Sequence, residues 1–131
     1  DKYMKKLIVN LIWEGALLLF LFTGCGNSDP YLTLSGYNAP ESIKVNTDYN
    51  IEGTIQCNDT IKCAGIRIKD NLSNTYEISK TLNNHENVFE LNRLNEYVDF
   101  GKLTKGEKTI EVIAVRNNSQ EILQQDIFIV E

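Results

Sequence analysis

From Tyr31 onward, apolar and polar residues alternate along short stretches of the chain. Within residues 49–57, Ile51 and Ile55 fall on one face of an extended backbone and Glu52 falls on the other. Alternation with a period of two predicts half-buried strands. No ten-residue stretch of residues 31–131 shows a convincing helical stripe. The pattern therefore predicts an all-β domain.

Turn-forming residues interrupt the alternation about every ten positions. The predicted strands are residues 31–34, 42–45, 49–57, 63–69, 76–82, 88–91, 109–116 and 122–130, with 94–100 as a strand or a tight helical turn. The predicted turns and loops are residues 58–60, 70–74, 83–87 and 117–120. About seven or eight short strands with this spacing are typical of an antiparallel β-sandwich of roughly 100 residues. A barrel of five or six strands is the structural alternative.

The alternation also predicts which side chains face the interior. We expect these to be buried between two sheets: Ile51, Ile55, Ile66, Ile68, Val112, Ala114 and Phe128. We expect these to be exposed: Glu52, Arg67, Lys69 and Glu111. A slip of one residue would exchange the two faces, so the register is testable.

Residues 4–25 follow a different pattern. Two lysines come after Met4, and an apolar run and small residues then lead to Cys25. A basic start, a short apolar core and small residues are the layout of a secretory signal. The uninterrupted apolar core, residues 15–22, is shorter than the roughly 20 residues that a membrane-spanning helix needs.

Residues 21–25, Leu-Phe-Thr-Gly-Cys, resemble the lipobox of bacterial lipoproteins. In that family the segment before the cysteine is removed and the cysteine carries a lipid. The resemblance implies a signal peptide at 1–24, a lipidated Cys25 with a tether at 25–30, and a domain at 31–131 on the extracytoplasmic face of the cell membrane. The alternatives are an uncleaved membrane anchor and cleavage by the ordinary signal peptidase.

The charge balance limits the partners of the domain. Removal of residues 1–24 leaves 10 of the 13 basic and 16 of the 18 acidic residues, with no cluster of Lys and Arg. This balance argues against nucleic acid as a partner. An anionic membrane surface would repel the domain, so we expect the lipid to provide the membrane attachment.

Several segments of the domain resemble an immunoglobulin-like module found in surface and cell-wall proteins of low-GC Gram-positive bacteria. The segments are Leu-Ser-Gly-Tyr-Asn-Ala-Pro at 34–40, residues 49–55, residues 92–103, Leu-Thr-Lys-Gly at 103–106, Val-Ile-Ala at 112–114 and Phe-Ile-Val at 128–130. The resemblance covers residues 31–131 and implies an immunoglobulin-like β-sandwich. Lys108 stands where this family usually has Tyr, which implies that a tyrosine-corner hydrogen bond is absent. Such modules often stand beside a peptidoglycan-cleaving domain.

Cys57 and Cys63 are the two cysteines that remain after Cys25. In an exported protein, two cysteines so close in sequence favour a disulfide. A turn at residues 58–60 would bring them to the Cα spacing of about 4.4–6.8 Å that a disulfide needs. A pair of free thiols is the alternative. We predict the bond.

The sequence contains no motif for catalysis, for a cofactor or for a metal. The only histidine, His85, lies in a polar segment. Carboxylates stand in separate predicted loops without a glycosidase motif: Asp59, Asp70, Glu86, Glu90, Glu96 and Asp99. Solvated surface charge is the default interpretation, and a calcium ion at a loop end is the alternative. We predict no catalytic residue, no cofactor and no metal site.

The last two predicted strands are apolar on both faces. Ile113 and Val115 in one strand, and Ile127 and Ile129 in the other, face away from the predicted core. Such β-branched residues either fill a partly covered sheet face or form a patch for a partner. They are the surface that the sequence nominates for recognition.

The sequence thus predicts a lipid-anchored, extracytoplasmic immunoglobulin-like domain with a non-catalytic binding, spacer or structural role. Its expected partners are the membrane, through the lipid, and an envelope protein or glycan. The first alternative is the N-terminal anchoring segment of a peptidoglycan hydrolase whose catalytic domain is absent from this chain. The second is an inhibitor or immunity lipoprotein that caps a secreted partner.

Overall fold

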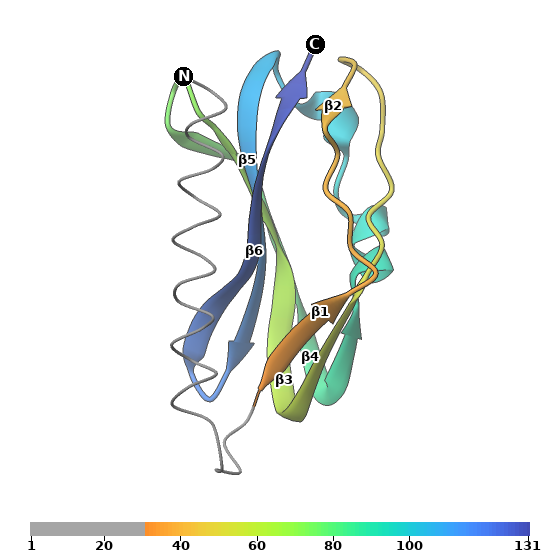
Figure 1. Cartoon of the computed structure of the whole chain (residues 1–131), viewed down its shortest axis with the longest axis vertical. Coiled ribbons are helices and arrows are strands. Elements are labelled where there is room, and N and C mark those ends of the chain that lie inside the picture. Colours follow the sequence, from red (N-terminus) through yellow and green to blue (C-terminus); the bar gives the residue numbers. More distant parts are fainter. Residues whose placement is uncertain (1–30) are drawn as a thin grey trace.

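The computed structural model of the chain describes residues 31–131, which are mostly β-structure (Figure 1). The strands are β1 (Leu32–Ser35), β2 (Ser42–Ile43), β3 (Thr54–Asp70), β4 (Thr75–Glu90), β5 (Gly106–Arg116) and β6 (Ser119–Val130). Two short 3-10 helices, η1 (Leu91–Glu96) and η2 (Phe100–Lys102), lie between β4 and β5 in sequence. No helix within residues 31–131 is long and apolar enough to cross a membrane. The predicted all-β class is confirmed.

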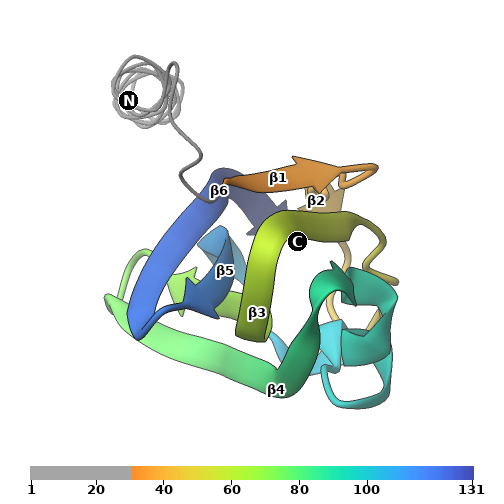
Figure 2. The same ribbon diagram turned by 90° about the horizontal axis from the view of Figure 1, so that it is seen from below.

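The six strands form one open, mixed sheet. Five of them follow the order β1-β3-β5-β6-β2, and the sixth, β4, pairs only with β3. Only β2 and β6 are parallel. The first half of β3 pairs with β1, its second half pairs with β5, and β4 runs along both halves. The chain bends along β3, so that β1 and β4 lie on opposite sides of the interior in the end view (Figure 2).

Two of the predicted turns are instead parts of long strands. Residues 58–60 lie in β3 and residues 83–87 lie in β4, and the two segments face each other in the sheet. The register between β3 and β4 shifts twice here, between Gln56 and Cys63. Such register shifts arise where one strand has extra residues that are not paired. These β-bulges bend a strand without ending it. The prediction of seven or eight short strands is therefore wrong in number, because four of them merge into β3 and β4.

The other two predicted turns are confirmed. Asn117 and Asn118 have φ angles of 50° and 64° and join β5 to β6. Positive φ at both central residues is the requirement of the tightest hairpin loop, and Asn tolerates it better than most residues. Residues 71–74 join β3 to β4, and the Asn74 amide donates to the Asp70 carbonyl at 2.8 Å.

The core lies on the inner face of the bent sheet, and the predicted register is correct there. None of the residues predicted to be buried is more than 1 % exposed: Ile51, Ile55, Ile66, Ile68, Val112, Ala114 and Phe128. Residues from η1 and from the segments around η2 complete the core, namely Leu91, Leu94, Val98, Phe100 and Leu103. The core therefore fixes the two short helices against the sheet.

The residues predicted to be exposed lie on the outer face, opposite the core, but not all of them contact solvent freely. Glu52 is exposed, while Arg67 and Lys69 are half-buried. Glu111 is only 6 % exposed, so its predicted exposure is wrong. Gln125 Nε2 donates to Glu111 at 2.6 Å and Arg67 Nη2 forms an ion pair with it at 2.9 Å. These side chains from the two neighbouring strands cover the carboxylate, and the long Arg67 side chain does so by lying along the sheet surface.

Candidate functional site

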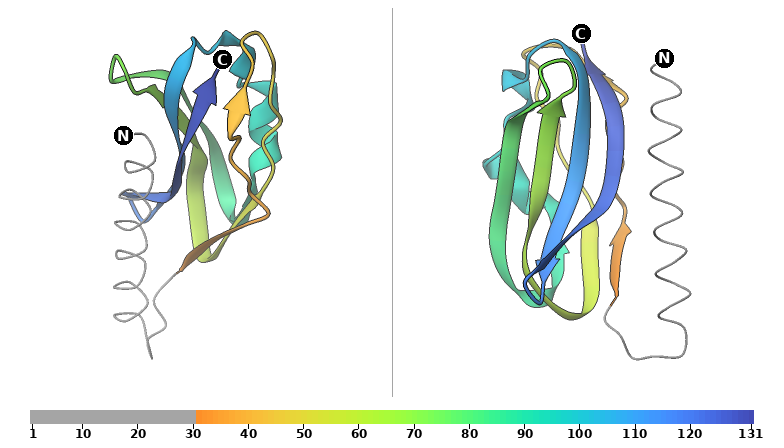
Figure 3. Two further views of the ribbon diagram at one scale, coloured as in Figure 1. Left: turned by 45° about the horizontal axis from the view of Figure 1, so that its top comes forward. Right: turned by 90° about the vertical axis from the view of Figure 1, so that its left-hand side faces the viewer.

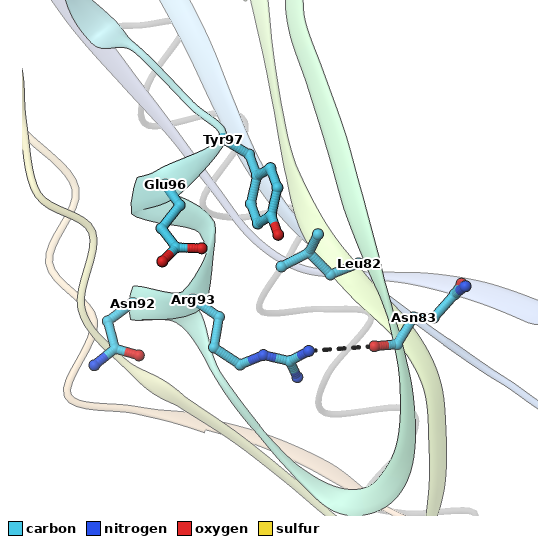
Figure 4. A pocket seen from close by; sticks show the side chains of 6 residues that line it. All are labelled: Leu82, Asn83, Asn92, Arg93, Glu96 and Tyr97. Carbon is cyan, nitrogen blue, oxygen red and sulfur yellow. Dashed lines mark hydrogen bonds between the residues drawn. The ribbon is translucent and has the colours of Figure 1, made fainter.

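A hollow of about 300 Å³ lies between β4 and η1 (Figure 4). It is lined by Leu82 and Asn83 from β4 and by Asn92, Arg93, Glu96 and Tyr97 from η1 and its C-terminal end. Helix η1 lies beside β4, on the other side of the molecule from β6 (Figure 3). The hollow is thus remote from the β5 and β6 surface that the sequence nominated.

The position of η1 follows from two leucines spaced three residues apart. A 3-10 helix has three residues per turn, so Leu91 and Leu94 share one face, and both are fully buried. The Leu91 amide donates to the Gly53 carbonyl at 2.8 Å. The amides of Tyr97 and Val98 both donate to the Leu94 carbonyl, at 2.9 and 3.0 Å. With the leucine face in the core, three polar residues of η1 are exposed: Asn92, Arg93 and Glu96.

A side-chain amide ties η1 to the segment before β3. Asn95 Oδ1 accepts from the Ile51 amide at 2.8 Å, and Asn95 Nδ2 donates to the Ile51 carbonyl at 3.0 Å. This pair of bonds copies the pattern between two strands, in which a residue exchanges both of its backbone groups with one partner. The helix is therefore held at a second point, independent of the leucines.

A third restraint comes from Asn84, which lies in the bulged part of β4 and is only 7 % exposed. Its Nδ2 lies 3.1, 3.1 and 3.2 Å from the carbonyl oxygens of Ile61, Glu86 and Val88. An amide nitrogen has two hydrogens, so three acceptors share them. The Asn84 side chain thus replaces backbone hydrogen bonds that the bulge removes. Its Oδ1 accepts from Arg93 Nη1 at 3.1 Å.

Arg93 connects this buried amide to the wall of the hollow. Its guanidinium lies over the Phe89 ring, 4.8 Å from the centroid, and its Nη2 donates to the Asn83 carbonyl at 3.4 Å. Lys80 makes a second contact of this kind, with its Nζ 4.9 Å from the centre of the Tyr97 ring. Both cations near the hollow therefore lie against an aromatic ring, an arrangement that the electron-rich ring faces favour.

The remaining groups of the hollow have no such partners. Within residues 31–131, the side chains of Asn83, Asn92 and Glu96 make no hydrogen bond and no ion pair. Tyr97 is 57 % exposed in spite of its contact with Lys80. The hollow thus combines an aromatic ring and an apolar floor with amide donors, amide acceptors and one carboxylate. Such a combination of groups is suited to orienting a ligand by hydrogen bonds and apolar contact.

Sequence reasoning did not find this site. In the sequence, Glu96 is one carboxylate among several, and residues 94–100 fit either a strand or a tight helical turn. The signal that was available is the spacing of Leu91 and Leu94, which is that of a 3-10 turn with polar residues on its outer side. Nothing in the local sequence indicates that Leu82 and Asn83 lie opposite this turn, because that contact depends on the bulge in β4.

The sequence-predicted lipidation residue, Cys25, lies outside the described residues. The predicted disulfide is not formed: Cys57 is buried, Cys63 is half-buried, and both are free. The reason is that residues 58–60 continue β3 instead of turning. A strand rises about 3.3 Å per residue, so a continuous strand carries two cysteines away from each other.

The predicted apolar patch lies on the outer face of β5 and β6, but it offers little free surface. Ile113 is 2 % exposed and is paired with Gly65 of β3. Val115, Ile127 and Ile129 are half-buried. The burial of Ile113 agrees with the first interpretation, in which these residues fill a partly covered sheet face.

A polar cluster separates the two halves of the predicted patch. The directly paired residues Glu111 and Gln125 lie between Ile113 at one end and Ile127 at the other. Tyr76 Oη donates to Glu111 at 3.2 Å. Burial and the nearby Glu111 carboxylate raise the pKa of Tyr76, so this hydroxyl stays protonated and keeps donating. The four apolar residues therefore do not form one continuous patch.

A second polar cluster surrounds Lys108, the residue that stands where the resemblance expects Tyr. Lys108 is fully buried. Its Nζ lies 2.7 Å from Asp70 Oδ1, 2.8 Å from Glu77 Oε1 and 2.7 Å from Thr104 Oγ1. An ammonium group has three donors, and all three are used here. The cluster is complete in itself and leaves no donor for a ligand.

The carboxylates of this cluster are stabilised in their charged form. Hydrogen bonds from Lys108 and from Ser73 lower the pKa of Asp70 from 3.8 to about 2. Burial raises the pKa of Glu77, but hydrogen bonds from Lys108 and Thr104 outweigh it, so the pKa is lowered. Both shifts indicate a structural ion cluster that stays charged at neutral pH.

No known protein family and no curated protein matches the chain. Among the residues that the structure describes, no group of three or more His, Cys, Asp and Glu side chains is arranged to hold a metal ion. The hollow beside η1 is accordingly the candidate site, and its assignment depends on its own geometry.

Proposed function

We propose that this chain is a lipid-anchored, extracytoplasmic binding module of the cell envelope, built on an immunoglobulin-like β-sandwich. One observation carries the binding role. The hollow between β4 and η1 presents unpartnered polar groups and an exposed aromatic ring on a support that is held at three points. Sites whose side chains are held in place before binding lose less conformational entropy when a ligand binds. The proposed role is non-catalytic.

The sandwich part of the proposal is supported by the path of β3. Its first half pairs with β1 and its second half pairs with β5, with a bend between them. The apolar residues of both halves, including Ile55 and Ile66, belong to one core. Two packed layers around a shared core are the basic architecture of sandwiches. Of the segments that resemble immunoglobulin-like modules, residues 112–114 lie in β5 and residues 128–130 lie in β6.

The anchor is supported by the sequence at residues 21–25 and by the charge of the domain. A lipid on Cys25 would leave six residues before β1. Six residues span at most about 20 Å when extended, so the domain would sit close to the membrane. The sequence of the domain is acidic on balance and has no cluster of Lys and Arg that would hold it there by charge, so the lipid would do so.

The anchor is tested by replacing the thiol that would carry the lipid. In a bacterial host we expect the wild-type chain to partition with membranes and to incorporate a fatty-acid label, and Cys25→Ser to do neither. Cys63→Ser is the matched control, because it removes a free and partly exposed thiol elsewhere in the chain. If Cys25→Ser still partitions with membranes and takes up the label, the lipid anchor is wrong.

A further inference from the structure

We infer that the hollow beside η1 binds an uncharged glycan chain, with Tyr97 as the surface on which a sugar ring stacks. This inference rests on the proposed function, because it names the ligand class of the same binding module. It goes further in assigning a chemical role to each side chain that lines the hollow.

The charges around the hollow argue for an uncharged ligand. Lys80 and Arg93 lie against the rings of Tyr97 and Phe89, and Glu96 is the one carboxylate in the lining. An anionic ligand would approach the Glu96 carboxylate, and a cationic ligand would approach two cations. In each case the ligand would bring its charge close to a protein group of the same sign, and such like-charge contacts oppose binding. A ligand without charge avoids both conflicts.

The unpartnered polar groups match sugar hydroxyls. The amides of Asn83 and Asn92 each provide donors and an acceptor, and the Glu96 carboxylate provides acceptors. A sugar hydroxyl is both a donor and an acceptor, so two adjacent hydroxyls on one ring complement an amide or a carboxylate. Hydrogen bonds to the charged carboxylate are the stronger of these.

The apolar part of the hollow matches the remaining surface of a sugar. Tyr97 is 57 % exposed, and Leu82 adds an aliphatic surface next to it (Figure 4). The face of an aromatic ring carries partial negative charge, which attracts the weakly positive C–H groups on one side of a sugar ring. The volume of about 300 Å³ lies at the lower end of the range for ligand sites, enough for one or two sugar units of a longer chain.

The structure favours a glycan over an extended peptide at this position. A peptide would add to the free edge of β4 by pairing with its backbone. Arg93 Nη2 already donates to the Asn83 carbonyl, and Arg93 is also held by Asn84 Oδ1 and by the Phe89 ring. An added strand would have to displace this side chain, whereas a sugar stacked on Tyr97 would not.

The test uses the full-length chain purified in a mild detergent. We would titrate it with uncharged hexasaccharides of glucose, galactose, mannose and N-acetylglucosamine, and with anionic polygalacturonate and cationic glucosamine hexasaccharides. At least one uncharged oligosaccharide should bind saturably, and each charged one should bind about tenfold more weakly or not at all.

Variants of the stacking residue give the sharper readout. Tyr97→Ala should weaken binding about tenfold, while Tyr97→Phe should bind within about threefold of wild type because the ring remains. Tyr31→Ala is the matched control, since Tyr31 is also an exposed tyrosine, 44 % exposed, but lies directly before β1. Asn92→Ala, which removes an exposed and unpartnered amide, should weaken binding several-fold.

Three results would overturn the inference: no saturable binding of any uncharged oligosaccharide, tighter binding of a charged one, or Tyr97→Ala binding as wild type does. These failures are distinct from failure of the anchor. A chain that takes up lipid but binds no glycan refutes only the ligand class. A chain that binds glycan through Tyr97 but takes up no lipid refutes only the membrane attachment.

Discussion

Strand β4 carries one polar network near its start and another in its bulged part, and the two networks differ in what they leave free. Near its start, Glu77 joins Asp70 and Thr104 around the buried Lys108, and every donor of the ammonium group is used. In its bulged part, Asn84 satisfies the backbone of the bulge and holds Arg93, which lies in the wall of a hollow. The first network closes on itself, and the second leads to the surface.

The difference indicates how to separate a structural polar cluster from a binding site in this fold. Buried charge alone does not mark a site, because the ammonium of Lys108 is fully satisfied. The site is marked by a satisfied support, Asn84 and Arg93, beside groups that have no partner, Asn92 and Glu96. Substitutions in the first network should therefore change stability alone, those in the support of the second should change both stability and binding, and those on its open side should change mainly binding.

The largest effect on the free energy of unfolding is expected in the first network, the closed network around Lys108. Lys108→Ala leaves Asp70 and Glu77 close together without the cation, and removal of one partner from a buried ion cluster costs about 3–5 kcal/mol. Urea unfolding at neutral pH measures this loss. Lys105→Ala, the replacement of an exposed lysine three residues earlier, should change the free energy of unfolding by less than about 0.5 kcal/mol. A similar small effect for Lys108→Ala would contradict the structural role of the cluster.

A smaller loss of stability is expected when Asn84, the buried residue of the second network, is replaced. Asn84→Ala leaves three backbone carbonyls of the bulge without their side-chain donor, and unsatisfied buried groups cost about 1–3 kcal/mol. The same change frees Arg93, so glycan binding should weaken as well. Asn87→Ala in the same strand is exposed and serves as the control in both assays. Normal binding by a destabilised Asn84→Ala chain would show that the two networks of β4 do not differ as described.

The two networks also show why the sequence predicted some parts of the fold and not others. Alternation in a single strand determines its faces, so the burial of Ile66 and Val112 follows from the local pattern. The hairpin at Asn117 and Asn118 follows from residues that tolerate positive φ. In both cases the physical cause lies within a few residues of its effect.

The bulged region could not be predicted in this way. Residues 58–60 and 83–87 have turn-forming composition, and each would turn if it stood alone. They lie opposite each other, and Asn84 supplies the missing hydrogen bonds, so both continue as strands. This outcome depends on a pairing between distant segments. The errors at Cys57 and Cys63, and the unseen hollow, follow from that single pairing.

The third prediction concerns the fall in the free energy of unfolding at acidic pH. Because the pKa of Asp70 is lowered to about 2 by Lys108 and Ser73, the folded state binds its proton less readily than the unfolded state, where the pKa is near 3.8. This contribution is complete above about pH 4 and is lost as the pH falls toward 2. Asp70→Asn should flatten the fall in unfolding free energy between pH 5 and pH 2.5.

Urea unfolding at a series of acidic pH values measures this dependence. Glu41→Gln, which changes an exposed carboxylate outside both networks, is the control and should keep the wild-type slope. An Asp70→Asn chain with the same acid dependence as wild type would show that the closed network does not contribute through its carboxylates. Glu77, whose pKa is also lowered, should contribute to the slope that remains.

The smallest effect on stability is expected at Tyr97, and it is the sharpest test of the comparison. Tyr97 lies on the open side of the second network and is 57 % exposed, and its ring contacts Lys80. Loss of an exposed contact of this kind costs about 0.5 kcal/mol, so Tyr97→Ala should unfold at nearly the same urea concentration as wild type. Its glycan binding should nevertheless fall about tenfold. Lys108→Ala should show the reverse, with a large loss of stability and, under conditions where it is folded, wild-type binding. If both variants lose stability and binding in proportion, the hollow has no role separate from the fold.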